Sequence, residues 1–582
     1  MDYRRALFLM ILTLLPSVGS FALCEEDARK RVYDHLIIRD HHAAVLEAKK
    51  AHVLFPESKL VQLALIDALC QSGEETEAWT RWEQIATHHP ETKQDRRVLE
   101  MLAWGVLNKG ESSTQLGIRF NSLLGAAFTH DAKAIPLLLE QLRSSNAMLR
   151  SIAIRIAAGF GDAPLKDEIA RLLTSEKVWY VRLEVIQAVG ALRMEELKPE
   201  LKEIIGNPKT LAEEKVAAII ALVSMYDAVE SAELLTLLKS ERAGLRQLGC
   251  EVVTHLNLKE ELSHLLPLLK DGSPDVRISA LNTLALMRVQ ALAGRRIEEL
   301  LLPLIDDPVP EVAITACYAM LLVDARAGEA HFQKWLSSEN SQWRRLASAA
   351  IAVSGKYGVA LAFKGMRESD DPYVRVNLAL GLIGQRHQVK MASDVLFEVF
   401  KEHQGTLWMW DNQYNPLFRS LAPSRVKHIE PVPHYPIVVD QLVRLDLLSV
   451  LSIVRYPKAQ EAVKAFLQAQ GWGVTGVAAA TLLQEGDDEA LEAVRALLND
   501  GDEKIRVQAA MIMAIVGSDP SAVHVLQEAY LHVDREMKIH ILEAVAHVGD
   551  PHSIPFLLEI LKEPFQVLRV VAASALIQCI YH

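Results

Sequence analysis

The sequence predicts an all-α protein, an α-solenoid in which helical hairpins stack one on another. Three observations lead to this fold class. Hydrophobic residues make up 50% of the 582 residues and charged residues 23%, so the chain can bury a large core. Only 28 glycines and 23 prolines interrupt it, and aromatic residues are scarce at 6%, which favours long helices packed through aliphatic side chains. A short motif also returns along most of the chain.

The first 22 residues have the three parts of a secretory signal peptide. Two arginines precede an apolar run from Ala6 to Leu15, and Pro16 and small residues follow. Cleavage after Ala22 removes two arginines and one aspartate, so the formal charge goes from −12 to −13. Lipidation of Cys24 and an uncleaved anchor remain as alternatives. We therefore expect an exported protein, periplasmic or envelope-associated, with no transmembrane span after signal removal.

Residues 23–125 carry a pattern of small residues with its own period. Alanines at positions 44, 48 and 51, with Pro56 after them, are matched 34 residues later by Ala78, Trp82, Ile85 and Pro90. Small side chains are needed where two helices approach closely, and the proline closes the turn. This spacing resembles tetratricopeptide repeats, and we expect two such hairpins here.

From residue 126 onward the chain repeats an arginine that follows an apolar residue. Neighbouring copies lie 31 or 32 residues apart, as at Arg150 and Arg182, or at about twice that interval where a copy is degenerate. The arginines of this set are Arg150, Arg182, Arg246, Arg277, Arg344, Arg375, Arg444, Arg506 and Arg569. The pattern predicts one repeat array over residues 126–400 and a second over residues 441–582.

One copy, residues 271–287, shows why each repeat is a helical hairpin. Asp271 or Ser273 can cap the helix that Pro274 opens, and an apolar stripe at Val276, Ala280, Leu284 and Met287 faces a neighbouring helix. A helix pair this short cannot bury its apolar faces alone, so each pair must stack on the next.

Three copies carry a family resemblance: SPDVRISALNTLALM, DPYVRVNLALGLIG and EKIRVQAAMIMAIVG. They resemble HEAT repeats of the short bacterial kind, also called HEAT-like repeats of phycobilin lyases. The resemblance implies stacked hairpins and says little about a ligand. It also implies an enzyme alternative, because similar repeats occur in lyases that attach bilins to phycobiliproteins, although the export signal argues against that role.

The repeat arginines allow two interpretations. They would line up along one side of the stack as an anion-binding ladder, or each would pair with an acid of an adjacent repeat and fix the stacking angle. Asp275, Asp370 and Asp502 are placed for the second arrangement, which we favour.

Residues 401–440 interrupt the array without a clear hairpin pattern. Seven aromatic residues fall between positions 397 and 435, and several prolines make the latter part extended or looped. Aromatic side chains on a long loop are typical of binding sites. The candidate partner-binding residues are Trp408, Trp410, Tyr414, Phe418 and Tyr435. The alternative is that these aromatics plug a distorted repeat junction.

No catalytic, cofactor or metal motif stands out. The chain has no HExxH, no GxSxG elbow and no phosphate-binding glycine loop, and its 20 histidines lack ligand spacing. A formal charge of −12 disfavours nucleic acid as a partner, and with it a DNA glycosylase built on such repeats. We therefore expect a non-enzymatic scaffold, without cofactor or metal, that binds protein partners, basic or extended segments among them, on a concave surface.

Overall fold

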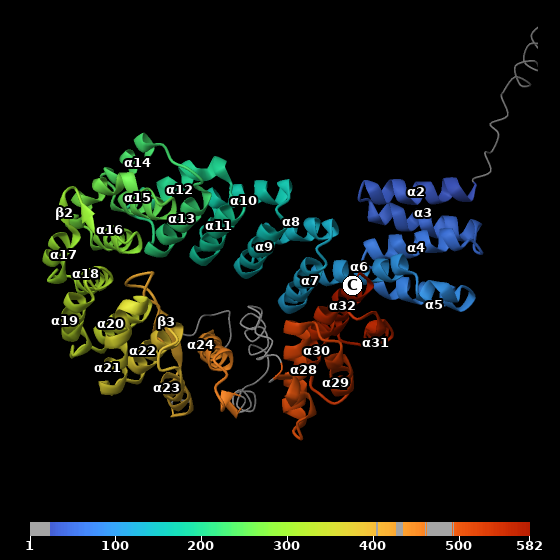
Figure 1. The fold of residues 1–582 in the computed structure, drawn as a ribbon. Helices are drawn as coiled ribbons and strands as arrows, with labels where there is room; N and C mark the ends of the chain where they lie inside the picture. Colours follow the sequence, from blue (N-terminus) through green and yellow to red (C-terminus); the bar gives the residue numbers. More distant parts are fainter. Residues whose placement is uncertain are drawn as a thin grey trace, which may run out of the picture. The chain divides into compact units, whose positions relative to one another are not determined.

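The structure, a computed structural model, describes residues 24–402, 405–425, 435–459, 461–462, 492 and 494–581. The predicted signal peptide lies outside these residues. The fold is an all-α solenoid of stacked helical hairpins, as the sequence predicts (Figure 1). The chain divides into two compact units: unit 1 is Met1–Leu137 with Val545–His582, and unit 2 is Leu138–Ala544.

Unit 1 joins helices from both ends of the chain. Its helices are α2 (Glu25–Ile37), α3 (His41–Leu54), α4 (Lys59–Gln71), α5 (Glu75–His88), η1 (Pro90–Lys93), α6 (Arg96–Glu111), α7 (Leu116–Phe128), η2 (Ala132–Ala134), η7 (Pro551–Ser553), α31 (Ile554–Ile560) and α32 (Gln566–Tyr581). Ala44, Ala48 and Ala78, which the sequence placed at close helix contacts, are buried. Each of these helices therefore presents its small residues to a neighbour, as a stacked hairpin requires.

Unit 2 is a succession of hairpins with a first and a second helix each. The first helices are α10 (Ala163–Ser175), α12 (Lys198–Gly206), α14 (Ser231–Leu238), η4 (Lys259–Lys270), α17 (Ile297–Ile305), α19 (Ala325–Leu336), α21 (Val359–Glu368) and α23 (Val389–Glu402). The second helices are α9 (Ala147–Phe160), α11 (Trp179–Ala191), α13 (Ala212–Met225), α15 (Ala243–His255), α16 (Pro274–Leu286), α18 (Pro310–Val323), α20 (Ser341–Val353), α22 (Pro372–Gly384) and α24 (Tyr435–Ile453).

Shorter elements and the end of unit 2 complete the list. They are η3 (Glu195–Leu197), η5 (Gly355–Gly358), η6 (Leu497–Asn499), α28 (Glu503–Gly517) and α29 (Ser521–Tyr530). Helices α8 (Ile135–Leu142) and α30 (Arg535–Val548) contain the two boundaries between the units.

The second helices of unit 2 form one continuous row. From α9 to α22 each contacts the next, because Val276, Ala280 and the equivalent apolar residues of every repeat face the neighbouring hairpin. In Figure 1 this row lies on the inner side of the curve that the green and yellow hairpins follow, and the first helices lie outside it. We call the surface of α9, α11, α13, α15, α16, α18, α20 and α22 the inner face.

Two short antiparallel ribbons are inserted into the helical array. Strands β1 (Ala291–Leu292) and β2 (Arg295–Arg296) form a small hairpin before α17. Strands β3 (Trp408–Asp411) and β4 (Ser420–Pro423) form the second, in the region where the sequence predicted an interruption. The pairing register sets Trp408 opposite Pro423 and Asp411 opposite Ser420.

The two units do not follow the boundaries drawn from the sequence. The predicted C-terminal array, residues 441–582, is shared between the units, and its last helix packs on α6 and α7 near the start of the chain. The repeat pattern reports which hairpins are neighbours along the sequence. It carries no information about a contact between segments more than 400 residues apart.

Candidate functional site

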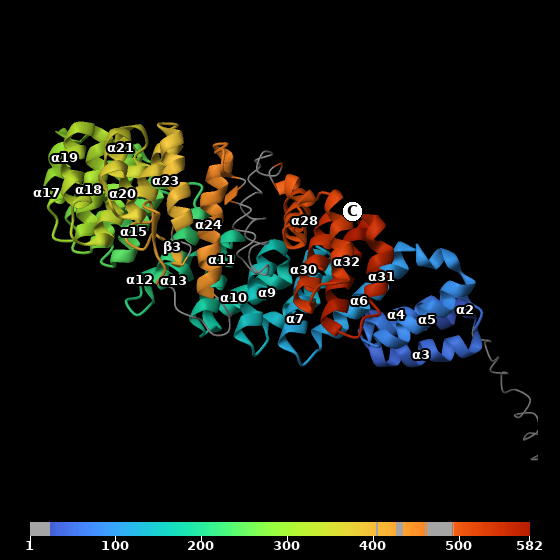
Figure 2. The same cartoon turned by 90° about the horizontal axis from the view of Figure 1, so that it is seen from below.

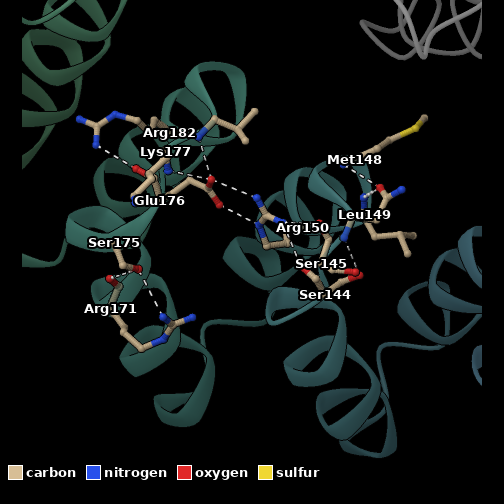
Figure 3. A network of polar contacts seen from close by, with 12 residues as sticks. Ser144, Ser145, Met148, Leu149, Arg150, Arg171, Ser175, Glu176, Lys177 and Arg182 are labelled. Atoms are coloured by element: carbon tan, nitrogen blue, oxygen red, sulfur yellow. Dashed lines mark hydrogen bonds and ion pairs between the residues drawn. The ribbon is translucent and has the colours of Figure 1, made fainter.

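The repeat arginines form ion pairs with acids of the following repeat. Figure 3 shows one of them: Arg150 of α9 donates to both carboxylate oxygens of Glu176, with N–O distances of 2.7 and 3.0 Å. Arg246 binds Asp271 in the same way, at 2.6 and 2.8 Å. Further pairs are Arg182 with Glu214, Arg277 with Asp307, Arg344 with Asp371 and Arg375 with Glu398.

Each pair also ties together two turns of backbone. Arg246 donates to the carbonyl oxygens of Ser240 and Glu241, which close the turn before its own helix, at 2.7 and 3.0 Å. Asp271 accepts the backbone N–H of Ser273 at 2.9 Å in the next turn. Arg150, Arg344, Arg506 and Arg569 hold equivalent pairs of carbonyls. The arginines therefore connect neighbouring repeats through their loops.

These arginines are neutralised within the chain, which fits the pairing arrangement and leaves no ladder of uncompensated charge at the paired positions. Burial raises the pKa of Glu176, but Arg150 and the backbone N–H groups of Val178 and Lys177 outweigh it, and the net pKa lies below its usual range. Asp275 and Asp370 are not the partners. The acids that act are the residues that shape the turns, such as Asp271 and Asp371.

The aromatic segment 405–425 lies on the inner face of unit 2. The loop between β3 and β4 reaches α16 and α18, where Asn415 exchanges side-chain amide hydrogen bonds with Asn282 at 3.1 Å and donates to Thr315 at 2.9 Å. In β4 the backbone N–H of Leu421 donates to the side chain of Asn377 on α22 at 2.8 Å. Side-chain amides of the second helices thus hold an extended segment of the same chain.

Two of the five predicted partner-binding residues are fully buried in this contact. Trp408 and Phe418 both have 0% exposed surface. The backbone N–H of Trp408 donates to Asp440 at 2.7 Å, and the guanidinium of Arg444 lies 4.1 Å from its ring centre. Phe418 packs edge-on against Tyr318 of α18. In this conformation both side chains stabilise the junction and offer no surface to a partner.

The other predicted partner-binding residues are placed differently. Trp410 is partly exposed, donates from Nε1 to Asp446 at 2.6 Å and lies under the guanidinium of Arg419. Tyr414 is also partly exposed and packs edge-on against Trp343 of α20. Tyr435 begins α24, and its side chain lies outside the described residues. A role of these three in binding stays a prediction.

The residues that hold the segment were not identified from the sequence. Asn282, Asn377 and Asp440 are between 2% and 5% exposed, and two of them are asparagines inside otherwise apolar helices. A buried polar group needs a hydrogen-bond partner, so an asparagine in an apolar stripe is the signal that points to such a contact.

The inner face continues uncovered beyond the tip of this hairpin. Ile220 of α13 lies five residues after Lys215, the same repeat position that Asn282 occupies after Arg277. Ile220 is 65% exposed and Val216 on the same helix 49% exposed. The repeat position that contacts the hairpin on α16 is therefore open to solvent on α13.

In unit 1 the last helix takes the place of a following repeat. Arg569 of α32 pairs with Glu75 at the start of α5 at 2.8 Å, the contact that elsewhere joins successive repeats. Glycines allow the close approach: a Cβ on Gly110 would lie 2.7 Å from Val570, and one on Gly125 would lie 3.0 Å from Ser574. Tyr581 donates a hydrogen bond to the buried Glu100, which also pairs with Lys133.

Among the described residues no group of histidine, cysteine, aspartate or glutamate side chains has the arrangement of a metal site. Cys70, Cys250, Cys317 and Cys579 are buried free thiols, and burial raises their pKa well above the ordinary value. Cys24 is exposed at the start of α2. Within the part of the chain that the structure describes, no helix is long and apolar enough to cross a bilayer.

Comparison with known families and structures gives the following. The sequence profile of the HEAT repeats matches residues 135–223 and 494–577, which include α9, α11, α28 and α32. No curated protein sequence matches the chain.

Several solved helical-repeat structures align with most of the chain at low identity. The Kap95:Nup1 complex aligns with 90% of this chain and 81% of its own, at 10% identity and a TM-score of 0.36. Kap121p bound to Pho4p covers 99% and 74%, at 11% identity and 0.28. The myosin chaperone UNC-45 from C. elegans, in complex with an Hsp90 peptide, covers 96% and 82%, at 13% identity and 0.26. Likenesses of this size carry no conclusion about a ligand.

Proposed function

We propose that this protein is a non-enzymatic scaffold that binds extended segments of other proteins on the inner face of unit 2. One observation carries the proposal: the second helices already hold a segment of this chain in extended form. Asn377 accepts a backbone N–H of β4, a contact that does not depend on the side chain of the bound residue. A face that binds backbone through amide side chains suits an extended polypeptide.

The uncovered part of the inner face supplies the surface for a partner. Val216 and Ile220 are exposed on α13, and apolar side chains exposed side by side on a repeat surface are typical of a contact site. On α9 and α11 the same face carries the exposed Arg155 paired with Glu184. The surface therefore offers apolar contacts with a charged pair beside them.

The charge of the chain favours basic partners. A formal charge of −12 attracts cationic segments and opposes an anionic membrane surface. Together with the signal-like N-terminus, this supports a role as an exported, periplasmic or envelope-associated scaffold. Mass spectrometry of the mature N-terminus tests the export part: cleavage after Ala22 or acylation of Cys24 supports it, and an intact Met1 on the bulk of the protein contradicts it.

A photo-crosslinking experiment tests the binding face. A benzoylphenylalanine is placed at Ile220 on the inner face or, as a matched control, at Leu302 on the first helix α17, which is 51% exposed. After crosslinking in the native host, mass spectrometry maps the partner residues. We expect adducts from position 220 that fall within one short stretch of a partner sequence, and none of these from position 302.

Substitutions at the same positions provide the second arm. Ile220→Asp puts a charge on the apolar surface and should weaken recovery of the mapped partner about tenfold, whereas Leu302→Asp should leave it unchanged. Equal adducts from both positions, or equal recovery by both variants, would show that the inner face is not the binding surface.

A further inference from the structure

Unit 1 contains a polar pocket that belongs to neither the ion pairs nor the inner face. It is a cavity of about 290 Å³ between α3, α4 and α5, the blue helices of Figures 1 and 2, and we call it the α3–α5 pocket. Its lining residues are His52, Glu57, Gln62, Leu65, Arg81, Gln84, Ile85, His88 and His89. Three histidines, an arginine and two glutamines converge there, a density of hydrogen-bonding groups that a purely structural cleft does not need.

Arg81 brings an uncompensated guanidinium to the pocket. Its nearest carboxylate is Glu77, at 3.7 Å, and that carboxylate is already bound by Lys49 at 2.9 Å. Within the described part of the chain Arg81 makes no hydrogen bond through its guanidinium. Its N–H donors are therefore available to a ligand, and the ligand that matches a guanidinium is an oxyanion.

His52 provides a second group without a partner. Its Nδ1 atom is shielded from solvent and has no hydrogen-bond partner among the described residues. Burial and the nearby charge of Arg81 lower the pKa of His52, so the free protein holds this imidazole neutral. An oxyanion beside Arg81 would reverse the second of these effects and favour the protonated ring, which can then donate to it.

The charges around the pocket decide what it binds. Arg81 and Glu57 are the fixed charges among the lining residues, and they balance. Nearby, Glu77 pairs with Lys49, and Glu91, which lies 3.4 Å from His89, pairs with Lys59. The balance at neutral pH is therefore set by the three histidines, and each proton they take up makes the pocket more positive. A metal ion is not favoured, because no group of metal-ligand side chains exists here or elsewhere in the described residues.

We propose that the α3–α5 pocket binds a small oxyanion, a carboxylate or a phosphate group, and takes up a proton as it does so. Binding is tighter at about pH 6 than at about pH 8, because only imidazoles change charge in that range. By linkage, a ligand whose affinity rises with protonation must itself raise the proton affinity of the site.

Isothermal titration calorimetry of the full chain tests this, with succinate and with inorganic phosphate as probes. Each titration is repeated in two buffers of different ionisation enthalpy, so that the difference in observed heat gives the number of protons taken up. We expect binding of at least one probe at about pH 6, weaker binding at about pH 8, and net proton uptake. Binding of one probe alone identifies the group as a carboxylate or a phosphate.

Three variants with opposite expected effects make the test specific. Arg81→Gln should lower the affinity about tenfold, since it removes the charge-assisted hydrogen bonds. Glu57→Gln should raise the affinity, a gain that misfolding cannot mimic. Arg31→Gln, at an exposed arginine of α2 outside the pocket, should change nothing. The proposal is overturned by no binding of either probe, by binding without proton uptake, or by equal effects of Arg81→Gln and Arg31→Gln.

Discussion

The ion pair between Arg246 and Asp271 gives the sharpest prediction about stability. The side chains are 17% and 8% exposed, and the arginine makes two hydrogen bonds to the carboxylate and two to backbone carbonyls. Arg246→Ala leaves the carboxylate buried with the N–H of Ser273 as its remaining partner among these contacts. We expect a loss of about 3 kcal/mol in the stability of this repeat junction at neutral pH, the low end for breaking a buried pair, because that N–H remains.

The pH dependence of this loss has a definite sign. In the native protein burial raises the pKa of Asp271, but Arg246 and the Ser273 N–H outweigh it, so the net pKa is lowered. Its stabilising contribution is thus present above the unfolded pKa and is lost as pH falls through the folded pKa. Without Arg246, burial raises the pKa, so the carboxylate destabilises at neutral pH and is relieved by protonation. The difference between the two proteins should therefore shrink as pH falls toward about 4.

Hydrogen exchange of peptides from α15 and α16 measures this locally, because repeat arrays need not unfold in one step. A double-mutant cycle with Asp271→Ala separates the pair energy from other effects. Arg375→Ala is the matched control: its acid, Glu398, lies 3.7 Å away and is 58% exposed, so we expect less than about 1 kcal/mol. Equal losses for Arg246→Ala and Arg375→Ala, or a coupling energy near zero, would refute the reasoning.

Three further predictions concern the hairpin and the last helix. Trp408→Ala should cost about 3–5 kcal/mol by leaving a cavity, and limited proteolysis should then cut within residues 405–425; unchanged resistance would contradict the packing role. Gly110→Ala should cost about 1–3 kcal/mol by pressing on Val570, seen as faster exchange in α32, whereas Gly117→Ala, with open space at its Cβ, should have no such effect. Glu100 has a net lowered pKa, because Lys133 and Tyr581 outweigh its burial, so its contribution is lost as pH falls through the folded pKa. Glu100→Gln should lower the melting temperature at neutral pH and leave less change between neutral and acid pH; an unchanged pH profile would contradict this.

The hairpin array and the pairing of its arginines follow from local sequence. A repeat of about 32 residues fixes where each arginine and each turn acid stand, so the acids that bind were within reach of prediction. Asp275 and Asp370 were the wrong choices because they were selected for being close to an arginine in sequence. Asp271 and Asp371 act because each ends a turn and faces the preceding repeat.

Long-range contacts could not be derived in the same way. Nothing in the local pattern relates Glu75 to Arg569, although one signal was present: α32 is apolar on nearly every side, with Val570, Val571 and Ala573 all buried. A helix of that kind needs neighbours all round, more than a single preceding repeat supplies. The polar residues that hold the aromatic hairpin were missed for a related reason, since a buried asparagine reveals that it has a partner but not which one.

The place of α32 has a consequence for the order in which the chain folds. Gly110 and Gly125 lie on helices made early in synthesis, but the residues that cover them, Val570 and Ser574, are among the last to leave the ribosome. Unit 1 therefore stays incomplete until translation ends. A truncation or a stop codon near the C-terminus would damage the beginning of the protein as much as its end.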